Sequence, residues 1–439
     1  MPLMIRTGNP LLPPLSSALT RTPSALRRLI PPGLLAVLGF LAALVAASPA
    51  RSTEWSITPS VSLQELYNNN ILLTPTPGPA VTGTVLTPSL GLTAQQQTWN
   101  LTGTAQWQNS RYSGQSGLNT NDQYLNLLSN YQTQRNTWGL TGTYAKESIL
   151  TSTAFVADVG LVHVQTQRIS RTISPTWTWT ISPTLNLQLG YQYNGVTYNE
   201  GAQAGLFNYS QHAANVTLSD QISTRNQIFG SAGYSYFQVP VLQFVGTDEK
   251  SNTSTAVLGL SHQFSRTFTG NLSVGAQYTR SSENQCNPII LAFFGQCYAT
   301  RAFSKNSGAI YNANLQKQFE RSSVTLALGR SISPSGAGTQ VLIDSGSLSA
   351  NWQFSERLLG MASADAYRIR AVGTSVTELN RNYYSTSAEL RWKWTRNLKV
   401  SALYEYIWVK YASGGALPAR SNSVYLTLKY SWPYLTVSR

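Results

Sequence analysis

The stretch TLNLQLGYQYN, residues Thr184–Asn194, decides the fold class of this chain. Apolar or aromatic side chains fill every second position of it: Leu185, Leu187, Leu189, Tyr191 and Tyr193. Successive side chains of a strand point to opposite faces, so this strand has one apolar face and one uncharged polar face. The apolar face ends in tyrosines, which is typical of membrane barrels, where amphipathic rings lie between hydrocarbon and headgroups. The pattern predicts an all-β, transmembrane antiparallel β-barrel.

The composition supports a barrel rather than a soluble protein or a helical membrane protein. Charged residues make up only 11% of the 439 residues, against about 25% in soluble globular proteins. After residue 50, no stretch of the chain reaches the roughly 20 apolar residues that a spanning helix needs. A closed barrel satisfies every backbone group in lipid without such a helix.

The first 50 residues resemble an export signal. Four arginines and no acidic residue precede an apolar run, Leu34–Ala47, which small residues, Ser48–Ala50, follow. The run is too short to span a bilayer, and the small residues are typical of a cleavage site. We expect a signal peptide over residues 1–50 and a barrel domain over residues 51–439; an uncleaved anchor is the alternative.

The alternation recurs to the end of the chain in segments separated by alternately short and long breaks. The short breaks carry Ser, Arg and Asn, as in Ser223–Asn226, whereas the long ones are rich in Gly, Asn and Pro, as in Tyr67–Thr82 and Ser281–Ser304. Short periplasmic turns and longer extracellular loops give barrels this asymmetry. We count 18 strands; without the two weakest, near residues 128 and 314, the count is 16. Their expected centres are residues 60, 89, 104, 128, 142, 176, 189, 216, 232, 258, 274, 314, 326, 348, 364, 388, 404 and 428.

The last three strands carry the candidate functional residues. A charge facing lipid at mid-strand costs about 2–4 kcal/mol, so the charged residues are assigned to the lumen. These residues form a predicted lumen charge cluster: Glu389, Arg391, Lys393, Glu405 and Lys429. The cluster either selects solutes in a hydrated passage or only pairs its charges between neighbouring strands. The alternation of inward-facing and outward-facing side chains (the parity of a strand) is less regular at Asp365, Arg368 and Arg370. We assign the two arginines to the outer interface.

Six basic residues are expected in the short turns. Solvated turn chemistry is the preferred interpretation over contact with a periplasmic partner or anionic headgroups. They are Arg225, Arg266, Arg321, Arg357, Arg396 and Lys399.

Two cysteines, Cys286 and Cys297, lie close together in the longest loop. An exported protein meets an oxidising compartment, so a disulfide between them is expected, with two free thiols as the alternative. The apolar segment Ile289–Phe294 between them has three interpretations: a constriction folded inward, an adhesive surface, or a loop packed on its own disulfide.

The sequence offers little support for an enzyme. Barrel hydrolases need a serine or an acid beside a histidine base, and no motif ties such a partner to His163, His212 or His262. We expect no catalytic residue, no metal site and no cofactor. Phosphate-binding glycine loops and nucleic-acid motifs are absent from the sequence, and an exported barrel does not meet nucleic acid.

Three segments resemble the β-barrel outer-membrane proteins that are encoded with exopolysaccharide and exosortase (PEP-CTERM) loci in Gram-negative bacteria. They are Ile57–Thr74, Val324–Asp344 and Ala419–Arg439. The resemblance implies a barrel linked to exopolysaccharide production or export, and it supplies no catalytic residues. The tail after Trp432 departs from barrels that end at a terminal aromatic residue.

Together these observations predict a porin-like channel in the bacterial outer membrane. The expected partners are outer-membrane lipid, polysaccharide or small solutes, and periplasmic secretion proteins. Two alternatives stay open: a barrel enzyme that acts on lipid or polysaccharide, and a non-conducting barrel that docks a secretion complex.

Overall fold

The computed structural model describes residues 53–114, 116–149, 166–240, 249–286, 299–372, 380–411 and 417–438. The expected signal peptide lies outside these residues and stays a prediction. Residues Glu54–Ser438 form one compact unit, the barrel. Among the described residues, no helix has the length and apolar character needed to cross a membrane.

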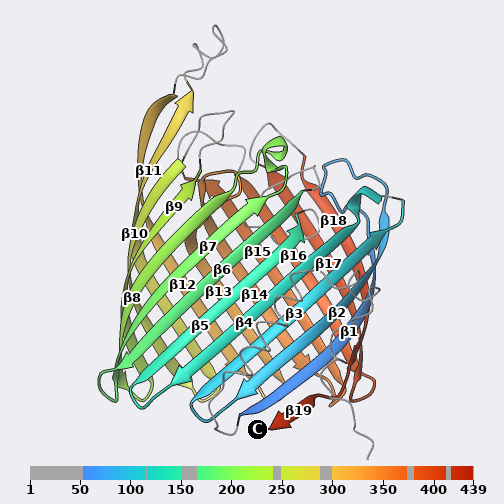
Figure 1. Ribbon diagram of the computed structural model, residues 1–439, viewed down its shortest axis with the longest axis horizontal. Coiled ribbons are helices and arrows are strands. Elements are labelled where there is room, and N and C mark those ends of the chain that lie inside the picture. The colour runs from blue at the N-terminus through green and yellow to red at the C-terminus, as the bar shows by residue number, and fades with distance from the viewer. Residues whose placement is uncertain are drawn as a thin grey trace, which may run out of the picture. The chain divides into compact units, whose positions relative to one another are not determined.

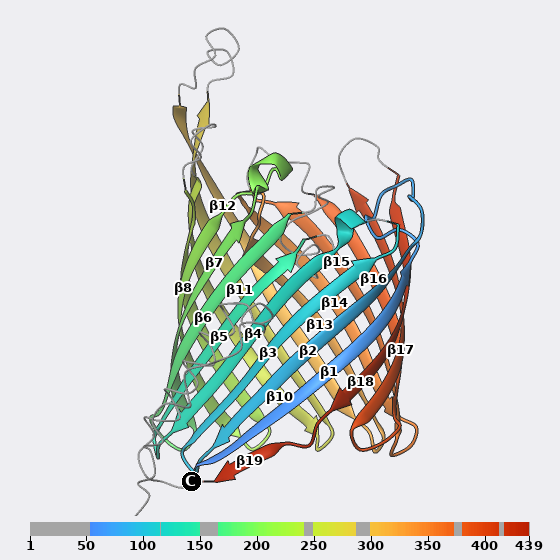
Figure 2. The same cartoon turned by 45° about the vertical axis from the view of Figure 1, so that its right-hand side comes forward.

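The chain forms a closed barrel of 18 antiparallel strands, each paired with the next, and β1 also pairs with β18 (Figures 1 and 2). Every predicted strand centre falls in its own strand, so the count of 18 is confirmed and 16 is wrong. The strands are β1 Glu54–Asn68, β2 Val81–Gln95, β3 Trp99–Tyr112, β4 Thr120–Gln132, β5 Asn136–Ser148, β6 Gln167–Thr180, β7 Leu185–Tyr198, β8 Tyr209–Ser223, β9 Asn226–Val239, β10 Glu249–Ser265, β11 Phe268–Cys286, β12 Ala299–Gln318, β13 Ser322–Pro334, β14 Gln340–Gln353, β15 Leu358–Ala371, β16 Arg381–Lys393, β17 Leu398–Tyr411, β18 Ala419–Ser431 and β19 Leu435–Ser438; two short 3-10 helices are η2 Ser116–Leu118 and η4 Gly201–Ala204.

The outer surface of the barrel is an apolar band. Leu258, Leu272 and Leu426 are 70%, 55% and 56% exposed. Each lies on the apolar face of its strand. Cross-strand pairing keeps that parity in register around the sheet: Leu189 of β7 lies opposite Val216 of β8. Large apolar side chains left uncovered in this way are in their favourable environment when lipid surrounds the barrel.

Aromatic side chains border the band at both ends. Where the short turns lie, Trp138 stacks on Trp177 and Trp392 on Trp394, each with ring centroids 5.6 Å apart. At the other end, the hydroxyl of Tyr234 donates a hydrogen bond to Asn252 (2.7 Å). Rings with an apolar body and a polar edge suit the two boundaries between hydrocarbon and headgroups.

The two ends of the barrel differ as the sequence predicts. At the short-turn end, a connection such as Arg266–Thr267 joins β10 to β11; at the long-loop end, residues 69–80 join β1 to β2. The expected loop Ser281–Ser304 is only partly a loop, because β11 continues to Cys286 and β12 begins at Ala299. These strands pair with each other and project beyond their neighbours (Figure 1). A ribbon in solvent needs no apolar face, so hydrophobic alternation does not reveal it.

The segment after Trp432 forms β19, a strand that the sequence pattern did not predict. β18 pairs with Ser60–Asn68 of β1, and β19 then pairs with Glu54–Ile57 of the same strand. Pro433 separates the two strands, as expected for a residue without a backbone N–H. The tail therefore extends the seam between the first and last strands.

Candidate functional site in the barrel lumen

Strand register places all five residues of the predicted lumen charge cluster on the inner face of the barrel. The residues that alternate with them face outward: Leu390 and Trp392 in β16 are 53% and 46% exposed, and Leu428 in β18 is 43% exposed. Cross-strand partners share a face, so the parity of one strand fixes that of the next. The inner placement is thus observed, whereas a role in selectivity stays a prediction.

A row of three lysines crosses the lumen wall near the short-turn end. Lys393 of β16 lies directly opposite Lys399 of β17, and Lys399 lies opposite Lys429 of β18. We call Lys393, Lys399 and Lys429 the basic row. The assignment of Lys399 to the turns was wrong: it is the second residue of β17 and has the inward parity of Ser401. That parity was available in the sequence.

Arg391 and Glu389, next to the basic row, form an ion pair within β16. Arg391 donates from Nη2 to both carboxylate oxygens (3.1 Å each) and from Nε to one of them (3.2 Å). Residues two apart in a strand share a face, which explains the contact. The pair neutralises itself, so the three lysines leave an excess of three positive charges at this level of the lumen.

Glu405 does not join the other four residues of the predicted cluster. It lies opposite Ser387 and Ser423, six residues along β17 from Lys399, a distance of about 20 Å along the strand. The hydroxyl of Tyr425 donates a hydrogen bond to its carboxylate (3.3 Å). The predicted cluster is therefore two separate groups, because alternation fixes the face of a residue but not its height.

The wall formed by β6–β8 is almost uncharged. Arg168, at the long-loop end of β6, is the one charged residue with inward parity in these three strands. Lower in the wall, Thr178, Gln188 and Thr217 lie directly opposite one another in neighbouring strands. We call β6–β8 the neutral wall and β16–β18 the charged wall. The two walls line the same lumen, but one carries several charged side chains on its inner face and the other almost none.

Two loops meet at the long-loop end of the neutral wall. The backbone N–H of Phe207, after β7, donates to the carbonyl of Gly336, after β13 (2.7 Å). A Cβ on Gly336 would collide with the hydroxyl of Tyr198. Gln340 accepts hydrogen bonds from Ser251 and Thr253 of β10, at 3.0 and 3.2 Å. Since β7 and β13 are six strands apart, the contact between their loops narrows the lumen mouth.

Apolar side chains form buried clusters beneath these loops. Tyr198, Leu206, Tyr209 and Phe237 belong to one buried cluster, and Phe237 is fully buried. On the other side of the barrel, Leu73 of the β1–β2 loop packs on residues of β16–β18. None of these contacts is predictable from the sequence, because they join loops whose apolar residues follow no period.

The two described histidines both lie on the outer face and not in the lumen. His212 is hydrogen-bonded through Nδ1 to the Tyr191 hydroxyl (2.7 Å), and His262 through Nδ1 to Asn226 Oδ1 (2.6 Å). Within the described part of the chain, neither histidine is hydrogen-bonded to a serine or a carboxylate, the partners expected of a hydrolase base. His163 lies outside the described residues.

Two other predictions remain as they were. Cys297 and the segment Ile289–Phe294 lie outside the described residues, so the disulfide from Cys286, the last residue of β11, stays a prediction. Among the described residues, no three His, Cys, Asp or Glu side chains are grouped so that they could hold a metal ion.

Comparison with known proteins places this chain in no family. No protein-family model matches this chain, and no curated protein matches it. Among solved structures, the siderophore receptor PiuA of Acinetobacter baumannii is 8% identical, with a TM-score of 0.47 over 88% of this chain and 82% of that one. OccAB2 of the same organism is 11% identical, with a TM-score of 0.43 over 86% and 98%. The outer membrane protein opdK of Pseudomonas aeruginosa is 12% identical, with a TM-score of 0.40 over 87% and 99%.

Proposed function

We propose that this chain is a porin-like channel of the bacterial outer membrane and that it prefers anionic solutes. The observation that carries this proposal is the basic row on the charged wall, formed by Lys393, Lys399 and Lys429. Like charges directly opposite each other in a sheet are destabilising. A lumen that holds three of them in register, without an acid between them, attracts anions passing the short-turn end.

The architecture supports the membrane location and the passage. A closed barrel with an apolar outer band and aromatic borders satisfies its backbone within lipid. Barrels of 16–18 strands leave an aqueous interior, and the inner face of the neutral wall is lined by Thr, Asn and Gln. By the usual asymmetry of such barrels, the short-turn end is periplasmic and the long-loop end is extracellular.

The resemblance to barrels of exopolysaccharide loci makes acidic polysaccharide the first large solute to test. Its carboxylates would interact with the basic row as small anions do. The contact between Phe207 and Gly336 at the mouth favours a second candidate function, a barrel closed at its outer end that only docks secretion partners. The same experiment separates the two.

The test is single-channel recording of the refolded protein in a planar bilayer under a KCl gradient. We expect steady conductance with a reversal potential that shows anion preference. The variant K393Q/K399Q/K429Q should lose most of that preference. Its matched control is R321Q/R357Q/R396Q, which removes three charges from exposed turns at the same end and should keep the preference.

Two outcomes would contradict the proposal. A protein that shifts on heating in gels, and is therefore folded, but never conducts would favour the docking barrel. Equal reversal potentials for the two triple variants would show that the basic row does not select ions.

A further inference from the structure

Basic side chains are concentrated on the outer face of the barrel at the long-loop end. On this face, at or beyond the aromatic border, the described strands carry twelve basic and two acidic residues by register. The basic residues are Arg111, Lys146, Arg171, Lys250, Arg280, Arg301, Lys305, Arg330, Arg368, Arg370, Lys410 and Arg420, and the acidic ones are Glu65 and Asp344. We call this set the basic collar.

The opposite end of the outer face shows no such excess. Among the described strands, only Asp220 of β8 and Lys317 of β12 are charged residues of outward parity near the short turns. Lys317 lies over the rings of Phe268 and Phe319, at 5.8 and 5.7 Å from their centroids. The excess of basic residues therefore lies on the side of one membrane leaflet only.

The densest part of the collar is a hollow on β10–β12. Arg280 lies directly opposite Lys305, and neither carries a carboxylate partner in the described part of the chain. A cavity of about 360 Å³ opens beside them, lined also by Lys250, Asn252 and Phe303. Phe303 is 75% exposed, and the Arg301 guanidinium lies 5.7 Å from its ring centroid. Opposed like charges beside a hollow suit an anion that bridges them.

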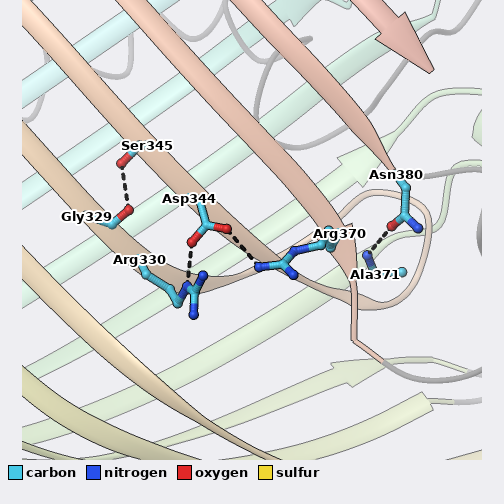
Figure 3. A network of polar contacts seen from close by, with 7 residues as sticks. All are labelled: Gly329, Arg330, Asp344, Ser345, Arg370, Ala371 and Asn380. Carbon is cyan, nitrogen blue, oxygen red and sulfur yellow. Dashed lines mark hydrogen bonds and ion pairs between the residues drawn. The ribbon is translucent and has the colours of Figure 1, made fainter. Parts of the chain in front are cut away.

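A second part of the collar holds two arginines in a fixed arrangement (Figure 3). Arg330 pairs with one carboxylate oxygen of Asp344, and Arg370 donates to the other (2.8 Å). The guanidinium of Arg330 also lies 5.4 Å from the ring centroid of Tyr311. One carboxylate thus orders two guanidinium groups, and a net positive charge remains for an external anion. Arg368, opposite Asp344 and exposed, adds to it.

The Arg280–Lys305 hollow and the Arg330–Arg370 pair both lie at the level expected for lipid headgroups. Arg280 lies 5.9 Å from the ring centroid of Tyr278, two residues nearer the apolar band, and Leu328 lies two residues below Arg330 on the same face. Guanidinium groups just beyond interfacial rings occupy the level of the headgroups, where clustered basic residues bind anionic lipids. Solutes entering the lumen do not touch this face.

We infer that the basic collar binds the phosphate groups of glycolipids in the outer leaflet, with the hollow formed by Arg280 and Lys305 as its strongest site. The inference rests on the membrane orientation in the proposed function but does not depend on conduction. Phosphate on a sugar headgroup presents several oxygens to two guanidinium or ammonium groups at once. The exposed ring of Phe303 offers an apolar contact beside them.

The test measures binding of lipid A, a glycolipid with two phosphates, to the folded protein in micelles of a neutral detergent. Basic residues near an anionic lipid surface contribute about fivefold each, so R280Q/K305Q should bind lipid A about 25-fold more weakly than wild type. The control variant K317Q changes an outward lysine at the other end and should bind as wild type does. Dephosphorylated lipid A should bind weakly to all three proteins.

Heat-modifiability in gels confirms that each variant is folded, and the double variant R330Q/R370Q gives an independent test away from the hollow. Equal binding of lipid A by wild type, R280Q/K305Q and R330Q/R370Q would overturn the inference. So would full competition by inorganic phosphate at the same phosphate concentration, which would indicate a general anion site. Channel recordings of the same preparations show separately whether the proposed function holds.

Discussion

The charged wall and the neutral wall line one lumen but differ in the charge of their inner faces and in the loops at their upper ends. β16–β18 place three lysines in register near the short-turn end, whereas β6–β8 place Thr178, Gln188 and Thr217 in an equivalent row. The neutral wall instead carries, at its upper end, the loop that reaches Gly336. We therefore propose that ion selection and access to the lumen depend on different parts of the barrel, so that mutations can separate them.

The largest expected effect comes from reversing the charge of the basic row. K393E/K399E/K429E should convert anion preference into cation preference, changing the permeability ratio about tenfold or more, because six units of charge change in a confined lumen. Reversal potentials in a salt gradient measure it.

The comparison variant is T178E/Q188E/T217E, which places three carboxylates on the neutral wall and changes the lumen charge by three units. It should lower the anion preference but not reverse it, since the basic row remains. If the neutral-wall variant also reversed the preference, the basic row would not determine selectivity, and our comparison would fail.

A smaller effect is expected from the loop contact at the mouth. G336V places a side chain against Tyr198 and Leu206, and overpacking of this kind costs about 1–3 kcal/mol. The two loops should separate, which raises the open probability or the conductance in single-channel records and leaves the reversal potential unchanged.

G117V is the control for the mouth variant, because a Cβ at Gly117 meets no atom within 4 Å. Its channel records should match those of wild type. A change in ion preference in G336V, or equal changes in G336V and G117V, would show that the mouth contact does not control access as we describe.

The smallest effect concerns stability. K399Q removes the central lysine of the basic row and with it two directly opposed like-charge pairs. Each such pair alters sheet stability by roughly 0.2–1 kcal/mol, so the variant should unfold at a higher urea concentration than wild type, with weaker anion preference. Unchanged or lower stability would mean that the lysines do not repel one another.

Alternation of polar and apolar residues predicted the strands and the faces of their side chains, because lipid leaves little freedom in either. It placed Arg391 in the lumen. It did not predict that Glu405 is remote from Arg391, since height depends on the register between strands. The contact of Phe207 with Gly336 could not be predicted for another reason. Loops outside lipid have no regular hydrophobic pattern, and the closed barrel determines which loops meet.

The seam between β1 and β19 has a consequence for the biosynthesis of the protein. Glu54 pairs with Ser438, so the contact spans 384 residues (438 minus 54). Pairing over such a separation is slow, because the entropy of closing the chain is lost before the contact forms. Until then, β1 and β18 both expose unpaired edges, which readily join other strands. The unfolded chain therefore needs protection of these edges until β1 has paired with β18 and β19.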